Sequence, residues 1–336
     1  MKKLNVGIAG LGRIGKIHLA NLMNTSQVNV VAATDPMEAC LQHAKELQIN
    51  FTTTSFEELI NHVEVDTVVI CSPTNTHADY VEMAAKAGKN IFCEKPLDLS
   101  LERVVEVLKV VKQTGTKLML GFNRRFDPEF KKVRDLVKEG NVGDPHLVKI
   151  TSRDPGAPPV SYIKTSGGLF LDMTIHDFDM ARFIVGKEIA EVFAKGAVLI
   201  DRAIGDAGDI DTAVVLLTYG DGTMAVIDNS REAAYGYDQR LEVFGSKGMV
   251  QAENRFNDSH RVYNSQGVHS SLPLHFFLER YEAAYRNEMN EFISCMLSGE
   301  PLPVDGEDGL QSLVIGLAAM RSLKENRPVK ISEISY

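Results

Sequence analysis

The chain has 336 residues, of which 44% are hydrophobic and 24% are charged, and its formal net charge is −9. This length is greater than one hydrophobic core usually organises, so we expect two domains. The negative charge, without a long basic run, argues against nucleic acid and anionic membranes as partners. The apolar runs are shorter than a membrane span, and we expect a cytoplasmic protein.

The first elements predict a nucleotide site. Residues 4–9 form an apolar strand, and the glycine fingerprint Gly10-Leu11-Gly12-Arg13-Ile14-Gly15 follows at once, leading into a helix over 13–23. Residues 28–34 form a second strand, which ends at Asp35. Glycines allow a pyrophosphate to approach the helix N-terminus, and the acid can accept hydrogen bonds from ribose hydroxyls. This pattern predicts an NAD site.

The alternation of strand and helix continues to residue 121. We expect helices over 37–48, 76–87 and 100–114 and strands over 66–71, 90–93 and 117–121. Ser100 is the expected N-cap of the last helix, and Gly115 is its expected C-terminal glycine. This order is typical of a doubly wound parallel sheet, whose ligands bind at the carboxyl ends of the strands. Two loops lie there, Ser72-Pro73-Thr74-Asn75 and Glu94-Lys95-Pro96.

Beyond residue 121 the pattern changes to a helix that ends near Gly140 and then to strands. The strands are expected over 146–152, 191–199, 211–219, 223–230, 240–245 and 249–253. Short turns at 220–222 and 246–248 predict hairpins, hence a mostly antiparallel sheet in an α+β domain. We therefore expect an NAD-binding Rossmann domain over 1–122, followed by a domain for substrate binding and oligomerisation over 123–336.

Strand 211–219 is apolar on both faces, so both faces of its sheet need cover. Helices such as 273–297 can cover one face. We expect a second subunit to cover the other, which gives a dimer or a tetramer.

Asp172, His176 and Asp179 lie at positions i, i+4 and i+7, so one helix would place them along a single face. A histidine between carboxylates is suited to accept a proton from a hydroxyl, with a carboxylate fixing its tautomer. The same residue types suit a divalent metal, and they also occur as polar clusters in protein cores. A neighbouring dinucleotide fold disfavours the metal, and we expect none.

The glycine fingerprint, Glu94-Lys95-Pro96 and the Asp172…His176 pattern together resemble the glucose–fructose oxidoreductase/inositol dehydrogenase (Gfo/Idh/MocA) family over nearly the whole chain. Three segments are similar to its bacterial inositol dehydrogenase branch: 152–155, 170–182 and 235–245.

The resemblance implies a catalytic set and two groups of binding residues. The catalytic set is Lys95, Asp172 and His176. Contacts to the cofactor are implied for the fingerprint residues Gly10, Gly12, Arg13, Ile14 and Gly15, for Asp35, and for Ser72, Pro73, Thr74, Asn75, His77, Glu94 and Lys95. Contacts to the substrate are implied for Lys95, Asn123, Asp154, Asp172, His176, Asp179 and Tyr235.

The expected reaction is oxidation of a ring hydroxyl of a cyclic polyol by NAD, foremost myo-inositol to its 2-keto form. His176 would be the base, and Lys95 would stabilise negative charge that develops on the oxygen. A sugar or anhydrosugar dehydrogenase is an alternative, as is a hydrolase or epimerase that oxidises its substrate transiently. A third class is a non-catalytic sugar sensor. Net accumulation of NADH distinguishes a dehydrogenase from the transient oxidisers.

Overall fold

The computed structural model describes residues 3–335, which form two compact units. The first unit contains the residues up to Phe126 together with Ala284–Leu313. The second contains Asp127–Ala283 and Val314–Ser335. This division differs from a single boundary after residue 122, because a C-terminal segment returns to the first unit.

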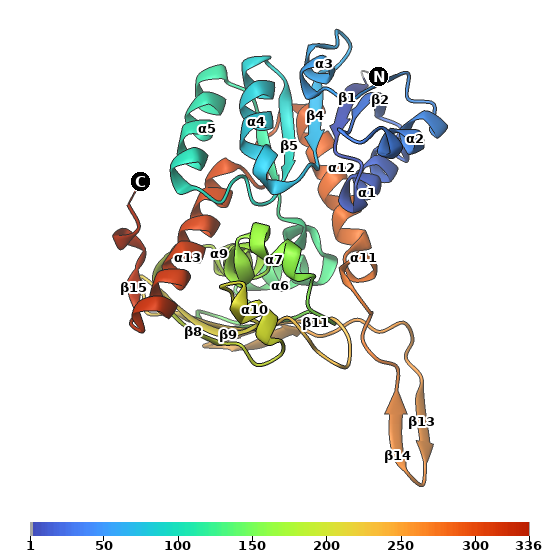
Figure 1. The fold of residues 1–336 in the computed structure, drawn as a ribbon. Coiled ribbons are helices and arrows are strands. Elements are labelled where there is room, and N and C mark those ends of the chain that lie inside the picture. Colours follow the sequence, from blue (N-terminus) through green and yellow to red (C-terminus); the bar gives the residue numbers. More distant parts are fainter. Residues whose placement is uncertain (1–2, 336) are drawn as a thin grey trace. The chain divides into compact units, whose positions relative to one another are not determined.

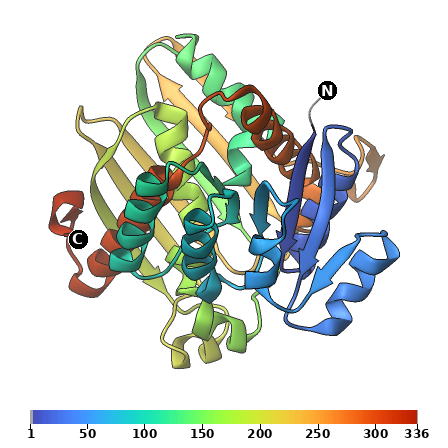
Figure 2. The same cartoon turned by 90° about the horizontal axis from the view of Figure 1, so that it is seen from above.

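The first unit is built on a six-stranded parallel sheet with the order β3-β2-β1-β4-β5-β6. Figures 1 and 2 show this part of the chain in blue to teal. The strands are β1 (Leu4–Ala9), β2 (Val28–Thr34), β3 (Phe51–Thr53), β4 (Thr67–Ile70), β5 (Asn90–Glu94) and β6 (Leu118–Gly121). The helices between them are α1 (Arg13–Met23), α2 (Glu38–Glu46), α3 (Phe56–Asn61), α4 (His77–Lys86) and α5 (Leu101–Thr114), with the short turn η1 (Thr74–Thr76). A second short turn, η2 (Asn123–Phe126), follows β6. The predicted doubly wound sheet is confirmed, whereas β3 and α3 were not predicted.

Local signals set the ends of α5 as expected. Ser100 Oγ accepts a hydrogen bond from the backbone N–H of Arg103 at 3.3 Å, which satisfies one of the open donors of the first turn. Gly115 ends the helix at a φ of +68°, a left-handed conformation that glycine adopts without steric cost.

The second unit is built on a seven-stranded sheet with the order β12-β11-β7-β10-β9-β8-β15. The strands are β7 (Pro145–Arg153), β8 (Ile189–Ala197), β9 (Thr212–Tyr219), β10 (Met224–Ser230), β11 (Asp238–Gly245), β12 (Gly248–Ala252) and β15 (Val329–Lys330). β7 and β10 are parallel, and the other pairs are antiparallel. The prediction of a mostly antiparallel sheet is confirmed, and both expected hairpins are present.

Helices cover one face of this sheet, as Figure 1 shows. They include α6 (Pro128–Lys138) and α9 (Ile175–Val185), which contact strands β7, β11 and β12. The other helical elements of the unit are α7 (Val160–Ser166), α8 (Gly168–Asp172), α10 (Arg202–Asp206), α11 (Phe277–Arg280), the later part of α13 (Gly306–Glu325) and the turn η3 (Ile331–Glu333). Most of the helix expected over 273–297 is α12 (Glu282–Ser298), whose residues from Ala284 onward group with the first unit.

The opposite face of the sheet is open in the single chain. In β9, Val215 and Leu217 are fully buried, while Val214 on the other face is 50% exposed. The cross-strand pairing places further exposed apolar side chains on the same open face: Met224, Phe244 and Met249. The two-sided apolar character expected for this strand is confirmed.

An unpredicted hairpin of β13 (Arg261–Asn264) and β14 (Gly267–Ser270) extends away from the sheet in Figure 1, and all its strand residues are exposed. Within residues 3–335, no helix combines the length and the apolar character required to cross a membrane.

Candidate active site

The glycine fingerprint forms a tight turn between β1 and α1. Gly10 has a φ of +88°, and a Cβ atom there would lie 2.6 Å from the backbone of Cys71 and Ser72. A Cβ atom on Gly15 would lie 1.9 Å from the carbonyl oxygen of Gly10. Glycine is therefore required at both positions, because any side chain would push the turn away from the strand end.

The start of α1 has the features that a pyrophosphate needs. Gly12 is its N-cap residue and provides no side-chain hydrogen bond, and a Cβ atom on Gly12 would meet no described atom within 4 Å. A phosphate can therefore approach the backbone N–H groups of the first turn, where the helix dipole favours negative charge. The residues present fit a dinucleotide.

Asp35 is held at the end of β2. Its Oδ2 accepts a hydrogen bond from the backbone N–H of Leu11 at 2.8 Å, and its Oδ1 accepts one from the N–H of Met37 at 2.9 Å. The side chain is buried beside the glycine turn. A carboxylate fixed in this way can accept hydrogen bonds from ribose hydroxyls without reorienting.

His77 connects the loops that follow β4 and β5. It lies at the start of α4 and is 2% exposed. Its Nε2 lies 2.8 Å from the carbonyl oxygen of Ser72, and its Nδ1 lies 2.8 Å from that of Pro96. Burial lowers the pKa of the imidazole below its ordinary value. The ring thus orders the Ser72 loop and the Glu94-Lys95-Pro96 segment, both of which were predicted to bind the cofactor.

A second buried histidine contacts the same segment. His18 Nε2, on α1, lies 2.6 Å from Glu94 Oε1, and the His18 side chain is fully buried. The Lys95–Pro96 peptide bond that follows is cis. Sequence reasoning missed His18, although a polar residue at the buried side of α1, three positions after Gly15, was an available signal.

Within residues 3–335, the one group of three potential metal ligands whose atoms lie within 4.8 Å of one another is His18, Glu94 and Glu288. Asp172, His176 and Asp179 do not form a second group of this kind among the described residues.

Asn123 begins η2, two positions after the end of β6. It is 3% exposed, and its Nδ2 group makes no hydrogen bond with any residue from 3 to 335. A buried donor without a partner costs free energy, which a ligand oxygen can recover. This feature fits the predicted role in substrate binding.

Asp172, His176 and Asp179 do not lie on one continuous helix, so that expectation is wrong. Asp172 ends α8, whereas His176 and Asp179 belong to α9. The interruption falls at Met173 and Thr174, whose N–H groups both donate to the carbonyl oxygen of Leu169. The hydroxyl of Thr174 also donates to Asn229 Oδ1 on β10 at 2.7 Å, which fastens the turn to the sheet.

Both acidic residues of α9 are buried, and Asp177 contacts the sheet. Asp177 is fully buried and accepts a hydrogen bond from Asn229 Nδ2 at 2.9 Å. Asp179 is 1% exposed, while His176 is partly exposed. A partly exposed imidazole on a helix fixed by buried carboxylates can exchange a proton while its backbone stays in place.

Asp172 is bound by two residues that sequence reasoning missed. Its Oδ1 accepts a hydrogen bond from the hydroxyl of Tyr162 at 2.9 Å, and its Oδ2 lies 3.3 Å from Nη1 of the buried Arg231. Asp209 binds the other side of Arg231, with Oδ2 3.3 Å from Nη2. Tyr162, Asp209 and Arg231 lie outside the sequence pattern of Asp172, His176 and Asp179, and no spacing rule points to them.

Tyr235 belongs to a different network. Its hydroxyl donates to Asp238 Oδ2 at 2.5 Å and accepts from Arg153 Nη1 at 3.0 Å. Burial, reinforced by Asp238, raises the pKa of the phenol. Cross-strand pairing places Arg153 and Asp238 on the open face of the sheet, opposite Asn229. The structure therefore does not bring the Tyr235 hydroxyl into the network of Asp172.

The neighbouring Asp154 is held through its backbone, whose N–H donates to Ser230 and whose carbonyl accepts from Ala233. This pairing joins the Ser-Arg-Asp-Pro segment to the chain that follows β10.

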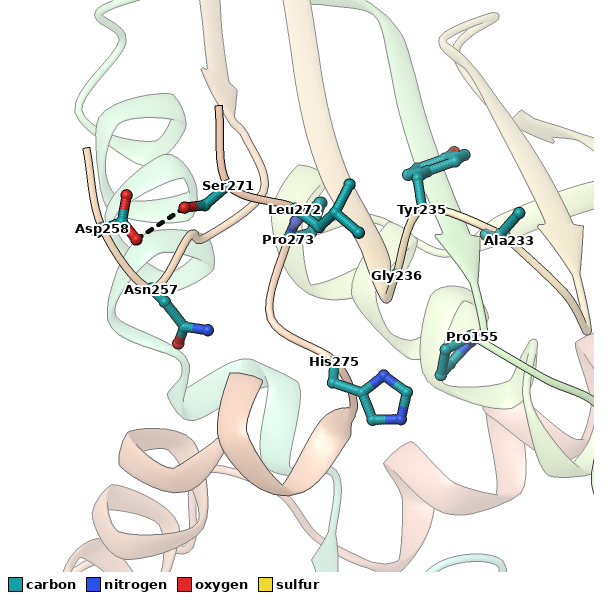
Figure 3. Close-up of a pocket in the computed structure, with 11 residues that line it drawn as sticks. Pro155, Ala233, Tyr235, Gly236, Asn257, Asp258, Ser271, Leu272, Pro273 and His275 are labelled. Carbon is teal, nitrogen blue, oxygen red and sulfur yellow. Dashed lines mark hydrogen bonds between the residues drawn. The ribbon is translucent and has the colours of Figure 1, made fainter. Parts of the chain in front are cut away.

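A cavity of about 370 Å³ lies beside Tyr235 in the second unit. Figure 3 shows Tyr235 and Ala233 on one side of it and Asp258 and Ser271, joined by a 2.7 Å hydrogen bond, on the other. Asp172 and His176 are not among the described residues that line it. We therefore do not assign the reaction to this cavity.

Comparison with known proteins identifies relatives over the whole chain. Residues 4–122 match the oxidoreductase family with an NAD-binding Rossmann fold, and residues 130–251 match the GFO/IDH/MocA C-terminal domain. The myo-inositol 2-dehydrogenase of Thermotoga maritima is 50% identical over 98% of this chain and 99% of that protein. The inositol 2-dehydrogenase of Rhizobium meliloti is 49% identical over 97% of this chain and 98% of that protein.

Solved structures give the same relationship. The scyllo-inositol dehydrogenase from Lactobacillus casei, with bound NAD(H) and scyllo-inositol, is similar with a TM-score of 0.92 at 35% identity, covering 98% of this chain and 100% of that chain.

Proposed function

The chain belongs to the Gfo/Idh/MocA oxidoreductase family, and we propose that it is an NAD-dependent dehydrogenase that converts myo-inositol to its 2-keto form. The observation that carries this proposal is sequence identity to two relatives that are named as inositol 2-dehydrogenases. They are 50% and 49% identical to this chain over nearly their full length. The uncapped start of α1 and the fixed carboxylate of Asp35 support NAD as the cofactor.

The proposed chemistry separates a hydride from a proton. Bound NAD supplies the hydride acceptor, its nicotinamide ring. His176 accepts the proton of the substrate hydroxyl, and the Lys95 ammonium donates a hydrogen bond to the same oxygen as negative charge develops there. Asp172 acts as a fixed hydrogen-bond acceptor, because Tyr162 and Arg231 already bind its two oxygens.

Four further residues are proposed to contact the substrate ring. The buried amide of Asn123 offers a donor, and it is the best supported of them. Asp154, Asp179 and Tyr235 stay predictions from the family resemblance, and the Tyr235 hydroxyl would have to leave Arg153 and Asp238 to reach the ring. Neutral and acidic groups of this kind favour polyol hydroxyls over an anionic substrate.

We also propose a homo-oligomer, foremost a tetramer, that operates in the cytoplasm. The open apolar face of the second sheet supports the assembly. The free thiols of all four cysteines are consistent with a reducing compartment.

A substrate panel tests the proposed function. The purified chain is incubated with NAD and with myo-inositol, scyllo-inositol or glucose, and NADH absorbance is followed. We expect steady NADH accumulation with myo-inositol and a lower kcat/KM with glucose. Scyllo-inositol is included because one relative, at 34% identity, is named a scyllo-inositol 2-dehydrogenase. Substrate conversion without NADH accumulation would instead indicate a transient oxidiser.

A further inference from the structure

We propose that Arg231 is a positioning residue for Asp172, and that Asp209 holds the Arg231 guanidinium in place. The proposal rests on the proposed function, since it assumes that Asp172 takes part in the reaction. It concerns a chain of hydrogen bonds within the second unit that ends at the Asp172 carboxylate.

The chain begins at a backbone amide. The N–H of Leu169, near the start of α8, donates to Asp209 Oδ1 at 3.0 Å. Asp209 Oδ2 then binds Arg231 Nη2, and Arg231 Nη1 binds Asp172 Oδ2, both at 3.3 Å. Because Asp172 ends α8, the chain connects the two ends of that short helix through residues distant in sequence.

The polypeptide is shaped to admit Asp209. Gly167 and Gly168 both have positive φ angles, of +87° and +77°. A Cβ atom on Gly168 would lie 2.7 Å from Asp209 Oδ1. A side chain at this position would therefore push the carboxylate away from Leu169 and Arg231.

Arg231 has little freedom to move. Its side chain is 1% exposed, and its backbone N–H donates to the carbonyl oxygen of Asp211 at 2.9 Å. The Asp211 carboxylate accepts from the N–H groups of Leu199 and Ile200, each at 2.8 Å. Hydrogen bonds thus hold both the backbone and the guanidinium of Arg231, as a positioning residue requires.

These contacts set the orientation of the Asp172 carboxylate. A guanidinium occupies Oδ2, and the hydroxyl of Tyr162, a residue 49% exposed on α7, occupies Oδ1. The carboxylate is therefore held by a donor at each oxygen, and it shares the positive charge of Arg231 with Asp209. It serves the reaction as an oriented acceptor, and the substrate proton goes to His176.

Four variants test the proposal: Arg231→Gln, Arg231→Lys, Asp209→Asn and the control Arg202→Gln, whose side chain is almost fully exposed on α10. We expect Arg231→Gln to lower kcat for polyol oxidation by roughly 10- to 100-fold, the scale for a misplacement of about 1 Å. The Kd for NAD should not change. Arg231→Lys should have a higher kcat than Arg231→Gln, because it keeps the positive charge. Asp209→Asn should also lower kcat, by a smaller factor than Arg231→Gln.

The effects of Arg231→Gln and Asp209→Asn should be far from additive in the double variant, because they act through one chain of contacts. A merely structural role would instead lower the melting temperature and leave kcat of the folded fraction unchanged. If Arg231 variants do not fold, Asp209→Asn and Tyr162→Phe decide the question by the same kcat measurement. Wild-type kcat in all the folded variants overturns the proposal.

A crystal structure of Arg231→Gln or Asp209→Asn gives a readout that needs no turnover. We expect the Asp172 carboxylate to leave its wild-type orientation. An unchanged orientation overturns the positioning role, even if the chain oxidises no polyol. Failure of the wild-type chain to reduce NAD with any polyol or sugar would refute the proposed function instead.

Discussion

His77 Nδ1 lies 2.8 Å from the carbonyl oxygen of Pro96, the residue that follows the proposed catalytic Lys95. The other ring nitrogen faces the carbonyl oxygen of Ser72 at the same distance. The buried imidazole lies between two loops at the carboxyl edge of the parallel sheet, the edge at which such sheets bind ligands, and in its neutral form it donates a hydrogen bond to only one of the two carbonyl oxygens.

This arrangement predicts a pH dependence of stability. Burial is the largest cause that lowers the pKa of His77. Below about pH 6.5 the unfolded chain therefore binds a proton at His77 more readily than the folded protein does. The contribution of His77 to the free energy of unfolding should therefore be unaffected above that pH and should decline as pH falls from about 6.5 to the lower folded pKa. Urea unfolding of wild type and His77→Gln between pH 5 and 7.5 measures it.

In that experiment His77→Gln should lose less stability on acidification than wild type. His269→Gln, at an exposed position on β14, serves as the control and should keep the wild-type slope. Equal slopes for wild type and His77→Gln would contradict the assignment.

Cofactor preference should follow Asp35. Its carboxylate would lie beside the 2′-phosphate of NADP, and Met37, which is 64% exposed, provides no compensating cation. We expect kcat/KM to favour NAD by roughly 100-fold or more, about 3 kcal/mol. Asp35→Ser combined with Met37→Arg should shift the preference toward NADP.

The same double variant should lose part of its total activity, because Asp35 also accepts a hydrogen bond from the glycine turn at Leu11. Met37→Ala is the matched control and should retain the NAD preference. Equal kcat/KM for both cofactors in the unmodified protein would refute this prediction.

Replacing His176 should damage the chemical step alone. We expect His176→Ala to lower kcat by roughly 10²–10⁴-fold, the usual contribution of general-base catalysis, with little change in the Kd for NAD. In the unmodified protein, kcat for alcohol oxidation should rise with pH as the imidazole loses its proton. Steady-state kinetics across pH 6–10 and fluorescence titration of NAD check both statements.

Lys95→Ala should cost about 3–4 kcal/mol of transition-state stabilisation, as the loss of an oxyanion donor does elsewhere. Its effect and that of His176→Ala should not add, because both groups are proposed to act on one oxygen. If His176→Ala keeps most of its kcat while Lys95→Ala has none, then lysine is the base. Full activity of both variants would remove the proposed catalytic set.

Assembly should depend on the open face of the second sheet. Val214 and Phe244 are each about half exposed there, and a charge on this face should prevent two sheets from packing together. Light scattering at micromolar concentration should give a multiple of the 37.1 kDa chain mass for wild type and a smaller mass for Val214→Asp with Phe244→Asp. Val63→Asp, at an exposed position in the first unit, is the control. A wild-type mass near that of one chain would contradict the prediction.

Local patterns determined much of the fold. Strand β1, helix α1 and strand β2 fall at the predicted residues, because the apolar runs and the glycine turn are encoded by neighbours in sequence. The caps of α5 follow from Ser100 and Gly115 for the same reason. The glycine fingerprint with Asp35 predicted the NAD site, and the resemblance of short motifs to a family then gave the oxidoreductase class.

Tertiary structure decided the surroundings of the candidate site. At the break between α8 and α9, Thr174 donates to Asn229, 55 residues away, a contact that helical periodicity does not reveal. Arg231 reaches Asp172 across 59 residues, and Asp209 reaches Leu169 across 40. Short patterns report the conformation of neighbouring residues, whereas these pairings exist only after the sheet has brought distant strands and turns together.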